Sequence, residues 1–200
     1  MTGQHARRSE TIEQQELHSD AVIFWFDDFE GEQPFRFLSN FYRGMPLAEP
    51  DLGYQWPTGE HMFAGYKATN RWDRERILLA VTPDDAKAIG RSINLRPNWE
   101  EIKYDVMRLV LRIKFTLERE EGQLLLETGD RLLVEGTWWN DRTWGVDLKG
   151  APTGRPWGGQ GRNWLGALLM ARRAGLRAAQ AHGVVTDYSA VRLFSRGRKV

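Results

Sequence analysis

A long helical pattern between Asn98 and about Arg119 limits what this chain can fold into more than any other feature. Apolar side chains recur there at helical spacing, at Ile102, Val106, Leu109, Val110, Ile113 and Leu117. Asn98 occupies an N-cap position, and Glu101 three residues later completes a pattern like a capping box. An amphipathic helix must bury its apolar side against other elements. The pattern therefore predicts a packed and mainly helical core.

Shorter segments on both sides add helices and a few strands. Helices are predicted at residues 60–69, 73–80, 82–90, 121–130 and 164–174. A strand is predicted at 21–26, and a short one at 54–56. Between residues 131 and 148, two short runs flank "WNDR", which indicates a hairpin or a tight loop. The expected fold class is mainly α, or α+β with a minor antiparallel β element, in a single compact domain.

The two ends of the chain differ from its middle. Residues 1–20 are polar and Gln-rich, which is typical of a disordered tail. Residues 176–200 form a predicted basic extension, so the folded domain is expected at 21–175. No apolar run approaches the length of a membrane span, and the first residues lack the apolar core of a signal peptide. We therefore expect a cytoplasmic protein with no membrane partner, and the pattern makes no prediction of oligomeric state.

Composition excludes several kinds of chemistry. The chain has no Cys, so it has no disulfides, Cys-ligated zinc or thiol nucleophile. Its four His are scattered, and no spacing matches a metal site, so neither metal nor cofactor is expected. The Gly-rich stretch 158–161 precedes a helix but lacks the βαβ unit of a dinucleotide site. The net charge of +1 gives no overall field for nucleic acid.

Two carboxylates remain as candidate catalytic groups. Glu60 and Asp141 each lie beside Trp-rich and Gly-rich segments, and the chain has nine Trp. A carboxyl group near aromatic walls can have a raised pKa and act as a general acid, as in cleavage of glycosidic bonds. The alternatives are a first-turn acid for Glu60, favoured by the helix dipole, and a turn residue for Asp141.

Seven segments, taken in order, resemble the NADAR, or YbiA-like, family of N-glycosidases over about 150 residues. They are "LSNFY" (38–42), "WPTGEHMFAGYK" (56–67), "AIGR" (88–91), "NWEEIKYDVMRLVLRIKF" (98–115), "LLLET" (124–128), "NDRTWG" (140–145) and "GRNWLGALLMARR" (161–173). The resemblance implies a mainly helical fold and hydrolysis of a bond between ribose C1′ and a nitrogen.

The resemblance also implies roles for particular residues. The family's catalytic glutamate falls on Glu60, and the aspartate just before its W-G segment falls on Asp141. The Trp of its N-W segment falls on Trp99, where stacking on a base competes with a purely structural role. The chain departs from the family pattern at Gly59, where many relatives carry Ser. It departs again at Asp147, an acid that competes with Asp141 for the functional role.

The remaining candidate residues are predicted to bind the substrate. Lys67 and Arg91 are candidates for contacting phosphate, with solvent exposure as the alternative. Asn40 and Phe41 are candidates for holding a base, or for closing a turn. Trp144, Asp147 and Asn163 complete the set, and the alternative for Asn163 is a helix cap.

The leading functional hypothesis is an N-glycosidase that removes ADP-ribose from guanine, in a nucleotide or in single-stranded DNA. Its support is the loop "KGAPTGRPWGGQGR" (149–162), which supplies two Arg, one Lys and Trp157, together with the basic extension. The alternatives are hydrolysis of phosphorylated ribosylaminopyrimidine intermediates of riboflavin biosynthesis, and a module that binds ADP-ribose or a nucleotide without turnover.

Overall fold

The computed structural model of the protein describes residues 21–25, 34–50, 52–149 and 159–184. The predicted N-terminal tail, most of the predicted basic extension and residues 150–158 of the long loop lie outside this part of the chain.

Helix α5 (Trp99–Lys114) is the long helix that the apolar pattern predicts. Val106, Leu109, Val110 and Ile113 are buried, and each such side chain contributes roughly 1.5–3 kcal/mol to folding. The helix ends at Lys114, earlier than predicted. Phe115 leaves helical backbone, with φ −111° and ψ 89°, and its ring is fully buried in the core.

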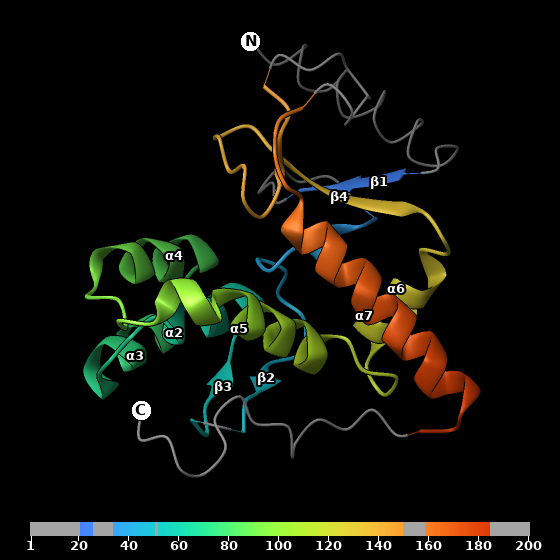
Figure 1. Ribbon diagram of the computed structural model, residues 1–200. Helices are drawn as coiled ribbons and strands as arrows, with labels where there is room; N and C mark the ends of the chain where they lie inside the picture. The colour runs from blue at the N-terminus through green and yellow to red at the C-terminus, as the bar shows by residue number, and fades with distance from the viewer. Residues whose placement is uncertain (1–20, 26–33, 51, 150–158, 185–200) are drawn as a thin grey trace.

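The other helices lie on two sides of α5 (Figure 1). On one side, α2 (Gly59–Gly65), α3 (Arg71–Leu78) and α4 (Pro83–Ser92) contact one another, and α2 contacts α5. On the other side lie α6 (Glu120–Glu127) and α7 (Trp164–Ala181), and a short 3-10 helix, η1 (Arg36–Leu38), contacts α6.

A capping box closes the start of α4. The Thr82 hydroxyl accepts the backbone N–H of Asp85 at 3.0 Å, and the Asp85 carboxylate accepts the N–H of Thr82 at 3.1 Å. Pro83 occupies the first turn, where no backbone N–H is needed. This capping box fixes the direction in which α4 leaves the loop, and α4 carries several side chains of the site described below.

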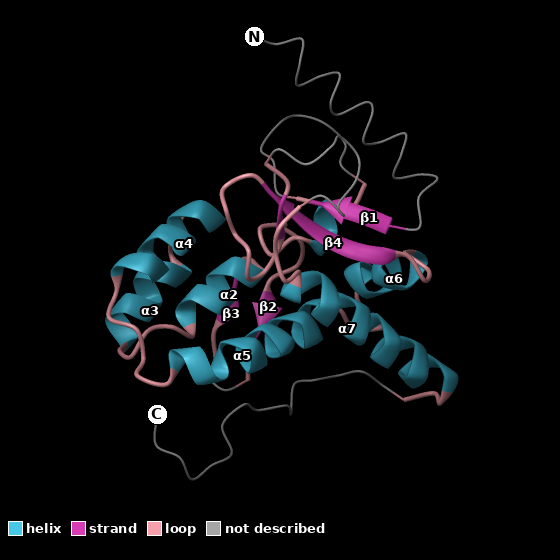
Figure 2. Cartoon of the chain, turned by 45° about the horizontal axis from the view of Figure 1, so that its top comes forward, coloured by secondary structure: helices cyan, strands magenta, loops and turns pink. Residues whose placement is uncertain are grey.

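The chain forms two small sheets. Strands β2 (Leu47–Ala48) and β3 (Gln55–Trp56) pair antiparallel and supply the predicted antiparallel element. Strands β1 (Ala21–Phe24), β4 (Leu132–Thr137) and β5 (Val146–Asp147) form a second, parallel sheet with β4 in the middle. In Figure 2, β1 and β4 lie at one edge of the helical body.

The hairpin alternative for residues 131–148 is wrong, because β4 and β5 run in the same direction. Alternation of apolar and polar residues along a strand does not distinguish parallel from antiparallel pairing. The path of the loop that connects the two strands decides their relative direction. Here the loop is held by the start of α7. The backbone N–H groups of Arg162 and Trp164 donate to the carbonyls of Arg142 and Thr143 at 2.9 and 3.3 Å.

Helix α7 packs against β4 and is longer than predicted. A Cβ atom at Gly166 would lie 2.1 Å from the carbonyl oxygen of Leu133, so only glycine allows this approach. The helix continues through Gly175 to Ala181, past the predicted domain end at 175. A glycine inside a helix costs only about 1 kcal/mol, and Leu176 beyond it is fully buried.

The fold class is confirmed as mainly helical, with one compact α+β domain. No helix in the described residues is long and apolar enough to cross a membrane.

Candidate active site

A cavity of about 420 Å³ lies between α2, α4, β4 and the loop that follows η1, within the usual size range of ligand pockets. Its walls combine carboxylates, cations and aromatic rings. The lining residues are Ser39, Asn40, Phe41, Glu60, Phe63, Lys67, Asp84, Lys87, Arg91, Met107, Glu135, Trp139, Asp141, Trp144 and Leu165.

Glu60 lies in the first turn of α2 and is only 7% exposed. Thr58 caps the helix by accepting the backbone N–H of His61 at 3.3 Å, and the backbone N–H of Glu60 donates to the Asn40 carbonyl at 2.9 Å. These contacts fix the backbone that carries the carboxyl group. Burial raises the pKa of Glu60, while the nearby charges of Lys67 and other cations act in the opposite direction. A solvated first-turn acid would not be buried in this way.

The loop of Asn40 packs directly on this first turn. A Cβ at Gly59 would lie 2.8 Å from Asn40 Oδ1 and 3.1 Å from Val110 Cγ1. Asn40 Nδ2 contacts the sulfur of Met107 at 3.2 Å, and Asn40 Oδ1 is buried with no hydrogen-bond partner in the described chain. Glycine at position 59 therefore leaves room for the Asn40 amide at the cavity wall.

Three cations line the cavity beside Glu60. The pKa of Lys67 is lowered by burial, and the charge of Glu60 opposes this change. Lys67 Nζ lies 5.2 Å from the centre of the Phe63 ring, and Lys87 Nζ lies 4.9 Å from that of Phe41. With Arg91 from the last turn of α4, these side chains form a positive wall suited to phosphate.

Glu135 is a further carboxyl group of the cavity and is not among the residues predicted from the sequence. It lies on β4, the middle strand of the parallel sheet. Burial, and then the charge of Asp141, raise the pKa of Glu135 from 4.5 to about 8, while Lys87 acts in the opposite direction. The sequence could have indicated Glu135 as a site residue. It interrupts the apolar run "RLLVEG", which is typical of a buried strand.

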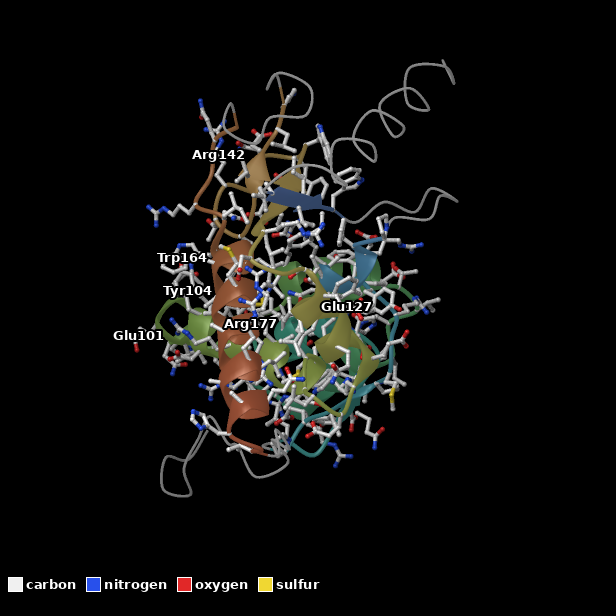
Figure 3. The ribbon with its side chains drawn as sticks, turned by 90° about the vertical axis from the view of Figure 1, so that its right-hand side faces the viewer. Glu101, Tyr104, Glu127, Arg142, Trp164 and Arg177 are labelled. Carbon is white, nitrogen blue, oxygen red and sulfur yellow. The ribbon has the colours of Figure 1, made fainter. Side chains whose placement is uncertain are left out.

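Asp141 lines the cavity and also holds a turn. Its Oδ1 accepts the backbone N–H groups of Thr143 at 3.1 Å and Trp144 at 2.9 Å. This turn presents the Trp144 ring to the cavity. Tyr104 of α5 supports that ring at 5.3 Å between centroids and contacts Trp164 of α7 at 5.0 Å. Figure 3 shows Tyr104 and Trp164 next to each other.

Three predicted site residues do not line the cavity. Trp99 is 6% exposed, and its ring packs against that of Phe63 at 5.1 Å between centroids. Phe63 lines the cavity, so Trp99 lies behind it. Asp147 Oδ1 accepts the backbone N–H of Lys149, and Asp147 Oδ2 lies 3.5 Å from the Arg142 guanidinium. Asn163, which adopts a left-handed conformation with φ 50°, bonds to the backbone of β4 rather than capping α7.

The other seven predicted residues meet at the cavity although they are far apart in the sequence. They are Asn40, Phe41, Glu60, Lys67, Arg91, Asp141 and Trp144. The lining residues that the sequence did not indicate are Ser39, Phe63, Asp84, Lys87, Met107, Glu135, Trp139 and Leu165. The sequence could have indicated Lys87, because it lies one helical turn before the predicted site residue Arg91 on the same side of α4.

Within the described residues, no three His, Cys, Asp or Glu side chains come close enough to hold a metal ion. His61 beside Glu60 is engaged on both ring nitrogens, by the Thr58 hydroxyl at 2.8 Å and the Ala80 carbonyl at 3.1 Å. It is a packed histidine, and burial lowers its pKa.

Fold and site together define a small helical domain in which the buried carboxyl group of Glu60 shares a cavity with three cations. The NADAR domain profile matches residues 24–177, so this chain belongs to the NADAR family, as its motifs indicated.

Relatives of known name support this assignment. N-glycosidase YbiA of Escherichia coli strain K12 is 42% identical over 123 residues, which are 60% of this chain and 71% of that protein. An N-glycosidase of Nostoc punctiforme is 33% identical over 72% of this chain and 88% of its own length. A riboflavin biosynthesis protein of Vibrio vulnificus is 30% identical over 82% of this chain and 42% of its own length.

The solution structure of Escherichia coli YbiA has the same fold. It superposes with a TM-score of 0.63 and 34% sequence identity, over 82% of this chain and 92% of that one.

Proposed function

We propose that this protein is an N-glycosidase that hydrolyses the bond between ribose C1′ and a nitrogen. One observation carries the proposal. The buried carboxyl group of Glu60 lies in a cavity that also contains three cations and several flat aromatic rings. Relatives at 33% and 42% identity are named N-glycosidases.

Each wall of the cavity supplies one requirement of this reaction. Ribosyl transfer passes through a cation-like sugar, which a carboxylate stabilises while it also activates water. Glu60 is the residue assigned to this role. Lys67, Lys87 and Arg91 would hold the phosphate of the substrate, and the aromatic rings would hold its base. Asp141 is assigned to shaping the site and to holding Trp144 in place.

Our first candidate substrate is guanine that carries ADP-ribose, in a nucleotide or in single-stranded DNA. Trp139 lines the cavity and is 49% exposed, and the adjacent Trp138 is 36% exposed. The aromatic surface thus continues from the cavity toward solvent, which suits a substrate longer than one ribosyl phosphate. Of the loop residues that suggested this substrate, Arg155 and Trp157 lie outside the described residues, whereas Lys149 and Arg162 lie within them.

A phosphorylated ribosylaminopyrimidine is the second candidate substrate. Relatives from Vibrio vulnificus and Zea mays are named riboflavin biosynthesis proteins. Such an intermediate needs one phosphate contact and one stacking surface, and the cavity offers both.

The test is incubation of the purified protein with both substrates, with mass detection of the freed base or amine. Release from either substrate supports the N-glycosidase proposal. The ratio of the two kcat/KM values, measured at two salt concentrations, decides the substrate class. Binding of both substrates without release would instead indicate a module that holds ADP-ribose or a nucleotide.

A further inference from the structure

The strand register places Glu135 where an apolar side chain would be expected. Successive side chains of a strand point to opposite faces. Leu133, two residues earlier, belongs to the main core, whereas Val134 packs in a separate cluster with β1 and β5 residues such as Ile23 and Val146. Glu135 therefore points to the same face of β4 as Leu133. Leu133 packs in the main core, whereas Glu135 lines the cavity.

The backbone of Glu135 is held by the start of α7. Asn163 Oδ1 accepts the backbone N–H of Glu135 at 3.1 Å, and Asn163 Nδ2 donates to the Leu133 carbonyl at 2.8 Å. Two hydrogen bonds from one amide thus bracket this part of β4. A side chain that must meet a reacting atom benefits from such a rigid support.

Glu135 Oε2 is buried without a hydrogen-bond partner among the described residues. Native proteins leave few buried polar atoms unpaired, and such an atom at a cavity wall indicates a contact that a ligand completes. Glu60 faces the same cavity from α2, so the two carboxyl groups can approach one ligand from different elements.

We propose, on the basis of the N-glycosidase function above, that Glu135 is the general acid that protonates the departing nitrogen. The C1′–N bond breaks, its electron pair goes to nitrogen, and that nitrogen takes the proton of Glu135. Water bonds to C1′ and gives its proton to the Glu60 carboxylate. The products are the free base or amine and a sugar with a hydroxyl at C1′. A proton then passes from Glu60 to Glu135 through solvent.

The charges around Glu135 agree with this role. Asp141 and Glu60 disfavour its ionisation, and Lys87 favours it. Lys67, Asp84 and Arg91 are the other charged side chains of the cavity. With its pKa raised to about 8, Glu135 keeps its proton at neutral pH. Asp141 is the weaker candidate for the acid, because its Oδ1 already accepts two backbone N–H groups.

The experiment compares Glu135→Gln, Glu135→Asp and the control Glu127→Gln, which changes an exposed glutamate on α6 (Figure 3). The substrates are ADP-ribosylated guanosine and the phosphorylated ribosylaminopyrimidine. Glu135→Gln should lower kcat by about 10²–10⁴-fold on whichever substrate the wild type hydrolyses, and it should leave substrate binding within about 3-fold. The control should match the wild type.

The pH profile separates a chemical role from a structural one. Wild-type kcat should fall as pH rises through about 8, because Glu135 then loses its proton. This fall should be absent in the residual activity of Glu135→Gln. Glu135→Asp keeps an acid, so it should retain the fall and exceed the Gln variant at least about tenfold.

Three results would overturn the assignment while the N-glycosidase proposal survives. They are a Gln variant near wild-type activity, a Gln variant that keeps the alkaline fall, and an Asp variant no better than the Gln variant. Wild-type protein that releases nothing from either substrate overturns the N-glycosidase proposal itself, and the role of Glu135 with it.

Discussion

Glu60 is the one carboxyl group of α2, a helix whose residues are all buried. It occupies the first turn of α2, where a carboxylate favours the helix dipole, yet it is 7% exposed and faces a cavity. A purely structural acid at this position would do equally well in solvent. The burial therefore favours a role toward a ligand.

Glu60→Gln should abolish hydrolysis and preserve binding, because the amide keeps the size of the side chain but takes no proton from water. We expect kcat to fall by about 10²–10⁴-fold, with the dissociation constant for substrate changed little. Glu101→Gln, which changes an exposed glutamate in the first turn of α5, is the control. Turnover at the wild-type rate would end the assignment of Glu60.

Two tryptophans should respond differently to removal. Trp139 is 49% exposed and lines the cavity, so Trp139→Ala should weaken substrate binding, with a stacking loss of about 1–3 kcal/mol, and leave the melting temperature nearly unchanged. Trp99 is buried against Phe63, so Trp99→Ala should cost about 3–5 kcal/mol of stability. Calorimetry and thermal melts on both variants test this, and the reversed pattern would restore Trp99 as the stacking surface.

At the scale of elements, α4 supplies most of the positive wall. Lys87 and Arg91 lie one turn apart on it, and its first turn is fixed by the Thr82–Asp85 capping box. Helix α3, by contrast, contributes none of the cavity-lining residues that the structure describes. The two helices therefore allow a matched test of how capping supports the site.

Thr82→Ala removes the cap of α4, and Asn70→Ala removes the cap of α3, where Asn70 Oδ1 accepts the Asp73 N–H at 2.9 Å. Each should lower the free energy of unfolding by about 0.5–2 kcal/mol. Only Thr82→Ala should also weaken binding of a phosphorylated ligand. Denaturant unfolding and titration with ribose 5-phosphate measure the two effects. Equal binding losses in both variants would show that the caps act only through global stability.

At the scale of the whole molecule, two buried groups give the stability a predictable dependence on pH. Glu135 has its pKa raised to about 8, and Lys114, which donates to the Ser39 carbonyl, has its pKa lowered by burial to about 7. Both groups are costly to ionise in the folded state, but they act in different pH ranges and with opposite signs.

For Glu135, the folded chain keeps a proton that the unfolded chain loses between pH 4.5 and about 8. The free energy of unfolding therefore falls as pH rises through this window. Above the window, the folded protein carries the full free-energy cost of ionising Glu135. Glu135→Gln should remove this cost, so its melting temperature relative to wild type should be higher at pH 9 than at pH 4. A constant difference across this range would contradict the raised pKa.

For Lys114, the folded chain holds fewer protons than the unfolded chain between about pH 7 and 10.5. Its contribution to the free energy of unfolding therefore increases with pH in this window and is least favourable below pH 7. Lys114→Met keeps an unbranched side chain without the charge, and it should flatten this increase. Thermal melts from pH 6 to 10 provide the measurement, and a variant that follows the wild-type slope would refute it.

Local patterns determined the helices and part of the site. The apolar spacing of α5 and the Thr82 cap are properties of neighbouring residues, so they can be recognised before folding. The motifs also identified Glu60 and Asp141 as cavity residues. Such features depend on contacts within a few positions of each other along the chain.

The tertiary structure decided everything that depends on contacts between distant segments. The parallel direction of β5, the position of Trp99 behind Phe63 and the use of Asn163 as a support for β4 all arise from such contacts. Glu135 lies 75 positions from Glu60 in the sequence (135 − 60), yet both line one cavity. Its burial and raised pKa come from neighbours that only the fold supplies, because desolvation depends on which surfaces close around a group rather than on its neighbours in the sequence.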